Sequence, residues 1–147
     1  QQNARGVLDI LSRELKMAGY KPNGGGFNGV TYSTTQLMVQ ADLNSDGAIS
    51  TSSTANEQIT YVFDSANEQI TRAVGSGSAQ VLAAHIAAFT FNYLDSAGSA
   101  TTVSANIRQV SITITAKTAK PDPNFTSNGG YRTYTMSATI TPGNLAL

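Results

Sequence analysis

The sequence predicts an α+β fold in which one N-terminal amphipathic helix packs on an antiparallel β-sheet. Near the start of the chain, apolar residues recur at helical spacing, and no second long stretch shows that period. Further along, several segments alternate apolar and polar residues, the pattern of strands that bury one face. A helix with one apolar stripe and a sheet with one apolar face bury both most simply against each other.

The predicted helix covers Ala4–Tyr20. Its apolar stripe consists of Val7, Leu8, Leu11, Leu15 and Ala18. Gly19 is a natural C-terminal stop, and Lys16 in the last turn suits the negative end of the helix dipole. The chain has no initiator Met and the helical pattern is already under way at its start. We therefore expect the sequence to be a piece of a longer protein.

Strands are expected from Val30 onward, after a glycine-rich loop over Lys21–Gly29. Gln58–Asp64 and Gln69–Val74 are predicted to form a hairpin. Further strands are predicted over residues 36–41, 88–95, 106–117 and 131–140. The alanine-rich segment 81–88 allows either a short helix or a strand.

The last two predicted strands are natural antiparallel partners. In the first of them, alternation places Val110, Ile112, Ile114 and Ala116 on one face. In the second, the face expected to be buried carries Tyr134, Met136, Ala138 and Ile140.

Composition excludes several classes of function. The 147 residues suit one domain with a real core, 40% are hydrophobic and only 12% are charged. The net charge is zero and the pI is about 6.8, so no electrostatic footprint for nucleic acid or anionic lipid is present. The absence of Cys excludes disulfides, thiolate metal ligands and a cysteine nucleophile.

Nothing in the sequence predicts an enzyme. His85 is the single histidine, and no GxSxG motif supplies an activated serine. No pattern marks two carboxylates as facing each other across a cleft. The glycines of Gly24–Gly29 lack the Lys-Ser/Thr pair of a phosphate-binding loop.

The sharpest local motif is DLNSDGAIS, over Asp42–Ser50, which matches the first nine positions of a calcium loop. Oxygen side chains stand at positions 1, 3 and 5, a glycine stands at position 6, and a carbonyl donor stands at position 7. The candidate Ca²⁺ ligands are Asp42, Asn44, Asp46, the carbonyl of Ala48, and Glu57.

The motif is incomplete, because position 12, where a bidentate Glu belongs, is Ser53. Glu57 is the nearest downstream carboxylate, and no helix follows, so the segment is not an EF-hand. Asp, Asn and Gly also favour Asx turns that hold no metal. Both interpretations, a weak calcium site and a metal-free turn, stay open.

Taken in order, several segments resemble one family, the type IV pilin-like proteins. QQNARGVLDILSRELKMAGY is similar to the lower half of the long N-terminal helix of minor pilins of the PilW type and the related J-type pseudopilins of type II secretion. DLNSDG, then ITYVFD with the following Thr71-Arg72, resembles the middle of that family. VLAAHIAAFTFNYLDSAG, NIRQVSITITAK and the closing ITPGNLAL resemble its later strands and its end.

The resemblance implies a single pilin-like domain over residues 1–147, with the rest of the helix in 1–20 and a β-rich globular part over 30–147. It implies a non-enzymatic subunit of a type IV pilus or type II pseudopilus, a minor pilin that primes assembly or sits at the filament tip. Other pilins or pseudopilins would be its partners. It would reside in the bacterial inner membrane and periplasm, then in a periplasmic or cell-surface filament. The family's apolar half-helix is missing from this sequence, so a membrane anchor is expected upstream.

In such a filament the helix packs against neighbouring subunits. The residues expected at that contact are Val7, Ile10, Leu11 and Met17. An alternative function is a stand-alone, calcium-stabilised extracellular binding or adhesion module that uses the loops Lys21–Gly29 and Thr118–Gly130 as its surface.

Overall fold

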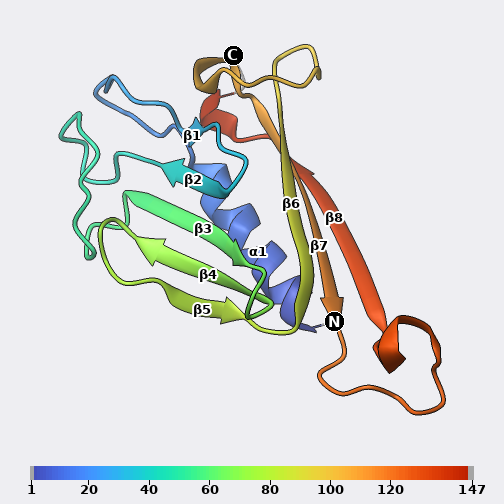
Figure 1. Cartoon of the computed structure of the whole chain (residues 1–147). Coiled ribbons are helices and arrows are strands. Elements are labelled where there is room, and N and C mark those ends of the chain that lie inside the picture. Colours follow the sequence, from blue (N-terminus) through green and yellow to red (C-terminus); the bar gives the residue numbers. More distant parts are fainter. Residues whose placement is uncertain (1, 146–147) are drawn as a thin grey trace.

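The structure of the chain, a computed structural model, describes residues 2–145, with side chains from residue 4 onward (Figure 1). Helix α1 spans Gln2–Met17. The first sheet holds β1 (Val30–Thr31), β2 (Gln36–Gln40), β3 (Gln58–Asp64), β4 (Gln69–Val74) and β5 (Gln80–Ala83), in that order. The second sheet holds β6 (Ile86–Leu94), β7 (Gln109–Lys117) and β8 (Thr133–Ile140), in that order.

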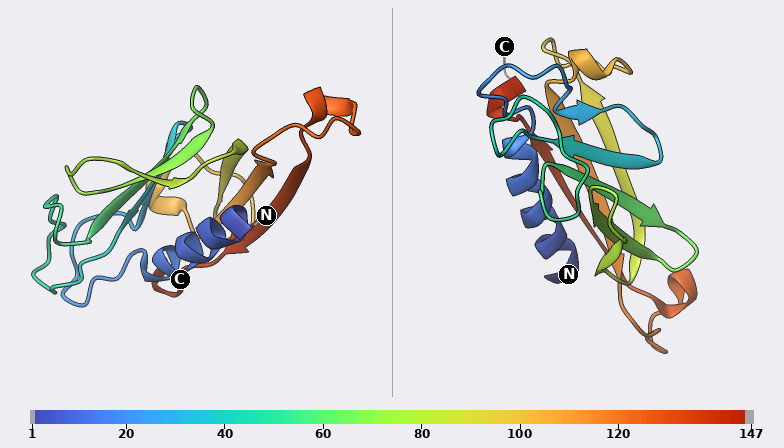
Figure 2. Two further views of the ribbon diagram at one scale, coloured as in Figure 1. Left: turned by 90° about the horizontal axis from the view of Figure 1, so that it is seen from below. Right: turned by 90° about the vertical axis from the view of Figure 1, so that its left-hand side faces the viewer.

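All strand pairs are antiparallel, so the predicted fold class is confirmed. The strands form two sheets, however, where the sequence suggested one. Figure 2 shows the sheets inclined to each other, with α1 along the open side between them. The helix contacts β2 and β5 of the first sheet and β7 and β8 of the second.

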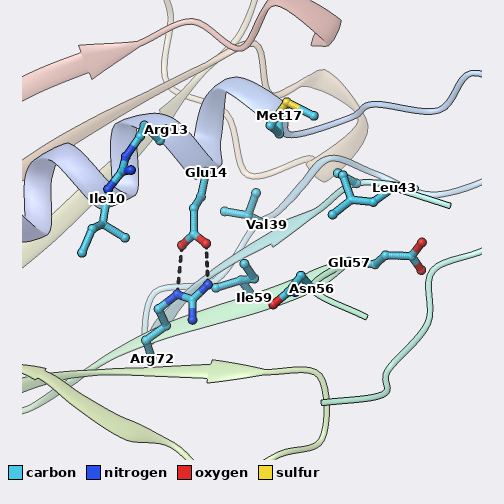
Figure 3. Close-up of a pocket in the computed structure, with 11 residues that line it drawn as sticks. Ile10, Arg13, Glu14, Met17, Val39, Leu43, Asn56, Glu57, Ile59 and Arg72 are labelled. Atoms are coloured by element: carbon cyan, nitrogen blue, oxygen red, sulfur yellow. Dashed lines mark hydrogen bonds and ion pairs between the residues drawn. The ribbon is translucent and has the colours of Figure 1, made fainter. Parts of the chain in front are cut away.

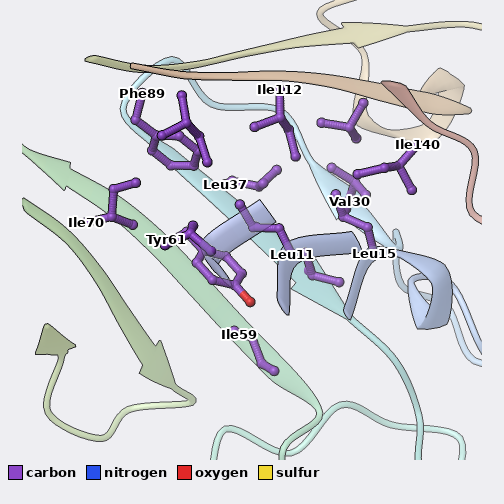
Figure 4. Close-up of a cluster of buried hydrophobic side chains, with 14 of the residues drawn as sticks. Leu11, Leu15, Val30, Leu37, Ile59, Tyr61, Ile70, Phe89, Ile112 and Ile140 are labelled. Atoms are coloured by element: carbon purple, nitrogen blue, oxygen red, sulfur yellow. The ribbon is translucent and has the colours of Figure 1, made fainter. Parts of the chain in front are cut away.

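The core lies where the helix meets both sheets. On α1 the buried residues are Ala4, Val7, Leu11, Leu15 and, just past its end, Ala18. Figure 4 shows Leu11 near Tyr61 of the first sheet, and Leu15 near Val30 of the first sheet and Ile140 of the second. The predicted apolar stripe is therefore the packing face, and only Leu8 in it stays partly exposed.

Backbone hydrogen bonds join the C-terminal end of α1 to β2. The helix ends at Met17, three residues before the predicted Tyr20, and Gly19 follows with φ of +81°. The Gly19 N–H donates to the Gln40 carbonyl at 2.9 Å, and the Gln40 N–H donates to the Gly29 carbonyl at 2.8 Å. A Cβ at Gly29 would lie 2.4 Å from the Gly19 nitrogen, so glycine is required at position 29.

The hairpin predicted from two neighbouring strands is confirmed. Six residue pairs connect β3 and β4, from Ile59 opposite Val74 to Asp64 opposite Gln69. The undecided segment 81–88 forms two strands, β5 and the start of β6, on different sheets. His85 lies at the turn between them with φ of +58°, which ends one sheet and begins the other.

Alternation on β7 is confirmed, because Val110, Ile112, Ile114 and Ala116 are all buried. On β8 the prediction is wrong for Tyr134, which is 39% exposed. Its neighbours Met136 and Ala138 are only partly buried, and Ile140 alone is fully buried. β8 is an edge strand with a neighbour on one side only, so its side chains are less covered than those of the central strand β7.

Candidate functional site

A groove of about 340 Å³ runs between α1 and the first sheet (Figure 3). The helix supplies one wall, strands β2, β3 and β4 supply the floor, and the loop after β2 closes one end. The groove is lined by Ile10, Arg13, Glu14, Met17, Val39, Ala41, Leu43, Asn56, Glu57, Ile59 and Arg72.

Much of the groove is apolar and open to solvent. Met17 on the helix is 44% exposed, and Leu43 in the loop is 43% exposed. Figure 3 shows these two side chains toward one end of the groove and Ile10 toward the other. Large apolar side chains that share an exposed hollow are typical of a surface that a partner covers.

An ion pair crosses the groove and ties the helix to the sheet. The Arg72 Nε donates to Glu14 Oε1 at 3.0 Å, and its Nη2 donates to Glu14 Oε2 (Figure 3). Both side chains are partly buried, and the hydrogen bonds to Glu14 raise the pKa of Arg72. Two parallel bonds of this kind fix geometry as well as charge. The pair therefore holds α1 at a set distance from β4.

The four helix residues expected at a partner contact fall into two pairs that differ in burial. Val7 and Leu11 are 2% and 0% exposed, because they face the protein's own sheets. Their side chains are unavailable to a neighbouring subunit, and this part of the expectation is corrected. Ile10 is partly buried and Met17 is exposed, and both line the groove.

In the Asp42–Ser50 loop, side-chain oxygens accept hydrogen bonds from backbone N–H groups of the same loop. Asp42 is fully buried; its Oδ1 accepts the Asp46 N–H at 3.1 Å and its Oδ2 accepts the Gly47 N–H at 2.8 Å. Asn44 Oδ1 also accepts the Asp46 N–H, at 3.0 Å. Asp46 Oδ1 accepts the Ala48 N–H at 2.9 Å. The bonds to Asn44 and Asp46, each from the N–H two residues on, are those of consecutive Asx turns.

Glu57, which lies seven residues after Ser50, also contacts this loop. It is 1% exposed; its Oε1 accepts the Asn44 N–H at 3.1 Å and its Oε2 accepts the Ser50 N–H at 2.7 Å. Within residues 2–145, no group of three or more His, Cys, Asp or Glu side chains is arranged to hold a metal ion. The loop is thus organised by backbone donors, with two buried carboxylates as its anchors.

Neither His85 nor the loop Thr118–Gly130 adds a residue to the groove. His85 is exposed at the turn between β5 and β6. The rings of Phe125 and Tyr131 lie under the cations of Arg132 and Lys117, at 4.6 and 4.5 Å from the ring centroids. These rings therefore anchor their own loop.

Sequence reasoning missed the role of Arg72 and of Leu43. A signal for Arg72 was present: it stands two residues after Ile70, which places a cation on the buried face of a predicted strand. A charge in such a place requires a partner. That the partner is Glu14, 58 residues earlier, depends on how the helix crosses the sheet.

Comparison with solved structures identifies the fold. The fold is similar to that of a type IV-like pilin, TTHA1219 from Thermus thermophilus, with a TM-score of 0.59 over 99% of this chain and 97% of that chain. The two sequences are only 14% identical, so this likeness shows the fold alone. No curated protein matches this chain in sequence.

A match to a family model then assigns the chain to a particular protein family. Residues 1–141 match the model of prepilin peptidase-dependent protein B, and the chain belongs to that family. Together the two findings confirm the resemblance to minor pilin-like proteins. Among residues 2–145, no helix has the length and apolar character needed to cross a membrane.

Replacing Glu14 by Gln should lower the free energy of unfolding by about 1–2 kcal/mol, because it leaves a partly buried guanidinium without its carboxylate. The measurement is urea unfolding at neutral pH. Glu68→Gln is the matched control, since Glu68 pairs with Lys117 and its side chain is more exposed than that of Glu14, so its loss should cost less. Equal losses in the two variants would contradict a special role of the Glu14–Arg72 pair.

Proposed function

We propose that this protein is a non-enzymatic structural subunit of a type IV pilus or a type II secretion pseudopilus. Its membership of the prepilin peptidase-dependent protein B family and its pilin fold support this function. Within that class we propose a minor subunit that primes assembly or sits at the filament tip. Its partners are other pilins or pseudopilins.

The single observation that carries the proposal is the divided surface of α1. One face, with Leu11 and Leu15, is fully buried against the protein's own sheets. The adjacent face, with Ile10 and Met17, borders an open apolar groove. A lone domain gains nothing from leaving Met17 and Leu43 in water. A subunit that packs against a neighbouring helix would cover them.

The place of the protein in the cell follows from the same proposal. An apolar segment of about 20 residues upstream of Gln1 would anchor the chain in the inner membrane before assembly. Removal of a short basic leader by a prepilin peptidase would precede its entry into the filament. After assembly it would belong to a periplasmic or cell-surface filament.

Met17→Glu in the full-length protein should reduce its incorporation into filaments at least tenfold, because it puts a charge into an apolar contact. The measurement is the amount of the protein that co-purifies with sheared filaments, relative to its total amount in the cell. Lys16→Glu is the matched control, since Lys16 is also exposed on α1 but does not line the groove. Wild-type incorporation of Met17→Glu, or an equal loss in Lys16→Glu, would contradict the proposed contact.

A calcium-stabilised binding or adhesion module is the second candidate function. The observation in its favour is that two fully buried carboxylates, those of Asp42 and Glu57, accept hydrogen bonds from backbone N–H groups of the same loop. Each of these carboxylates accepts two backbone N–H groups, and a carboxylate has about four lone-pair sites. Oxygen lone pairs thus remain for a hard cation. Asp42, Asn44, Asp46, Glu57 and the Ala48 carbonyl would hold it.

If this loop binds Ca²⁺, the melting temperature should rise with calcium concentration in the 10⁻⁴–10⁻³ M range, by mass action on the folded state. Asp46→Ala should abolish that rise. Asp95→Ala is the control, because Asp95 also accepts loop N–H groups, from Ala97 and Ser99, but lies in a different loop. A melting temperature that calcium leaves unchanged would contradict the calcium site and leave the Asx-turn interpretation.

A further inference from the structure

The outer edge of the second sheet is open along all of β8. Its strand order is β6-β7-β8, so β8 has a neighbour on one side only. In Figures 1 and 2 no other strand or helix lies beyond that edge. A free edge presents a row of backbone donors and acceptors that another strand can use.

The register identifies the groups that face outward. The Thr118 N–H donates to the Arg132 carbonyl at 2.9 Å, just before β8 begins. Because hydrogen-bonded pairs alternate along an antiparallel ladder, even-numbered residues of β8 bond to β7. The N–H and C=O groups that point away from the sheet belong to Thr133, Thr135, Ser137 and Thr139.

Of the other three sheet edges in the described chain, two are short and the third, β6, carries a loop hydrogen bond near its end. β1 has two residues, and β5 has four residues with a bulge in its pairing to β4. On the free side of β6, the Tyr93 carbonyl already accepts the Thr101 N–H at 3.0 Å. β8 has eight residues, TYTMSATI, without Pro or a charged residue. None of the usual devices that protect an edge is present there.

The apolar face of β8 is also incomplete. Tyr134, Met136, Ala138 and Ile140 alternate as in a strand with one buried face, yet Tyr134 is 39% exposed and only Ile140 is fully buried. The other face carries only hydroxyl side chains. An added strand would therefore find an apolar row on one side and a hydroxyl row on the other.

We propose that β8 pairs antiparallel with β8 of a second copy of this chain, around a two-fold axis at Met136. In this register Thr133 faces the partner's Thr139, and Thr135 faces the partner's Ser137. These four outward residues of each copy form hydrogen-bonded pairs, eight bonds in all by the alternation of the ladder. A typical protein interface has about 10 ± 5 hydrogen bonds, so this count lies within the usual range.

The side chains also match in this register. On the apolar face Tyr134 lies opposite the partner's Ala138, a large residue against a small one, and Met136 meets its own copy. On the other face hydroxyl residues oppose each other, which is a favourable cross-strand combination. No like charges meet within the paired strands. Such self-complementarity is the requirement of a two-fold interface.

The strand pairing goes beyond the proposed function and is independent of it. It uses β8, whereas the proposed filament contact uses the groove beside Met17. A two-fold pair reverses one copy relative to the other, while subunits of a polar filament share one direction. The pair is therefore a form of the protein outside the filament.

Ser137→Pro tests the pairing directly. The Ser137 N–H points away from β7, so proline removes an intermolecular donor and leaves the ladder within the protein intact. We expect the 147-residue chain to dimerise in sedimentation velocity between 1 µM and about 1 mM, the range of weak association. The variant should have a dissociation constant at least tenfold higher. If Ser137→Pro misfolds, Thr135→Lys provides the same test through charge repulsion.

Cysteine cross-linking tests the register. The protein has no cysteine of its own. Met136→Cys should give a disulfide-linked dimer under mild oxidation, because the two copies of this residue form a close, non-hydrogen-bonded pair. Tyr134→Cys should not, since Ala138 lies opposite. A monomer at every concentration, undiminished dimerisation of both edge variants, or equal cross-linking of the two cysteine variants would overturn the proposal.

Discussion

The burial of one helix stripe between two sheets is the constraint on which the rest of the structure depends. The two sheets share no ladder, and the side chains of Leu11 and Leu15 fill the space where they come together with the helix. Full burial of each leucine contributes about 1.5–3 kcal/mol. The remaining contacts of α1, the Gly19–Gln40 hydrogen bond and the Glu14–Arg72 ion pair, set its position along and above the first sheet.

This arrangement explains how one helix can serve two purposes. The residues that hold α1 to its own domain lie on one side, and Ile10 and Met17 lie next to them at the edge of the groove. A neighbouring subunit can then cover the groove while the domain stays intact. Under the proposed function, this division would let a rigid domain join an assembly without refolding.

Much of the fold could be predicted from the sequence because its patterns are local. The stripe of α1 and the alternation on β7 each depend on one face being buried, and the structure buries those faces. The division into two sheets could not be predicted, since it depends on a single turn with positive φ at His85. The exposure of Tyr134 was missed for a related reason: alternation reports which face a side chain takes, but not whether anything covers that face.

The candidate site was predictable only in part. Ile10 and Met17 follow from the helical wheel, whereas Val7 and Leu11 were assigned to a partner although they belong to the stripe that the domain itself buries. The groove also needs Leu43 and Arg72, which lie far from the helix in sequence. Their place depends on how the helix crosses the sheet. The sequence did suggest Glu57 beside the Asp42 loop, as the nearest carboxylate downstream, although its spacing does not match the calcium motif.

Native-state hydrogen exchange of the α1 amides tests the central claim most directly. If the helix stripe holds both sheets together, the amides of Leu11 and Leu15 should exchange only by global unfolding, with the same free energy as the central strands β3 and β7. Exchange of these two amides at a clearly lower free energy, while both strands remain protected, would contradict the account. In that case the sheets would form a stable unit without the helix.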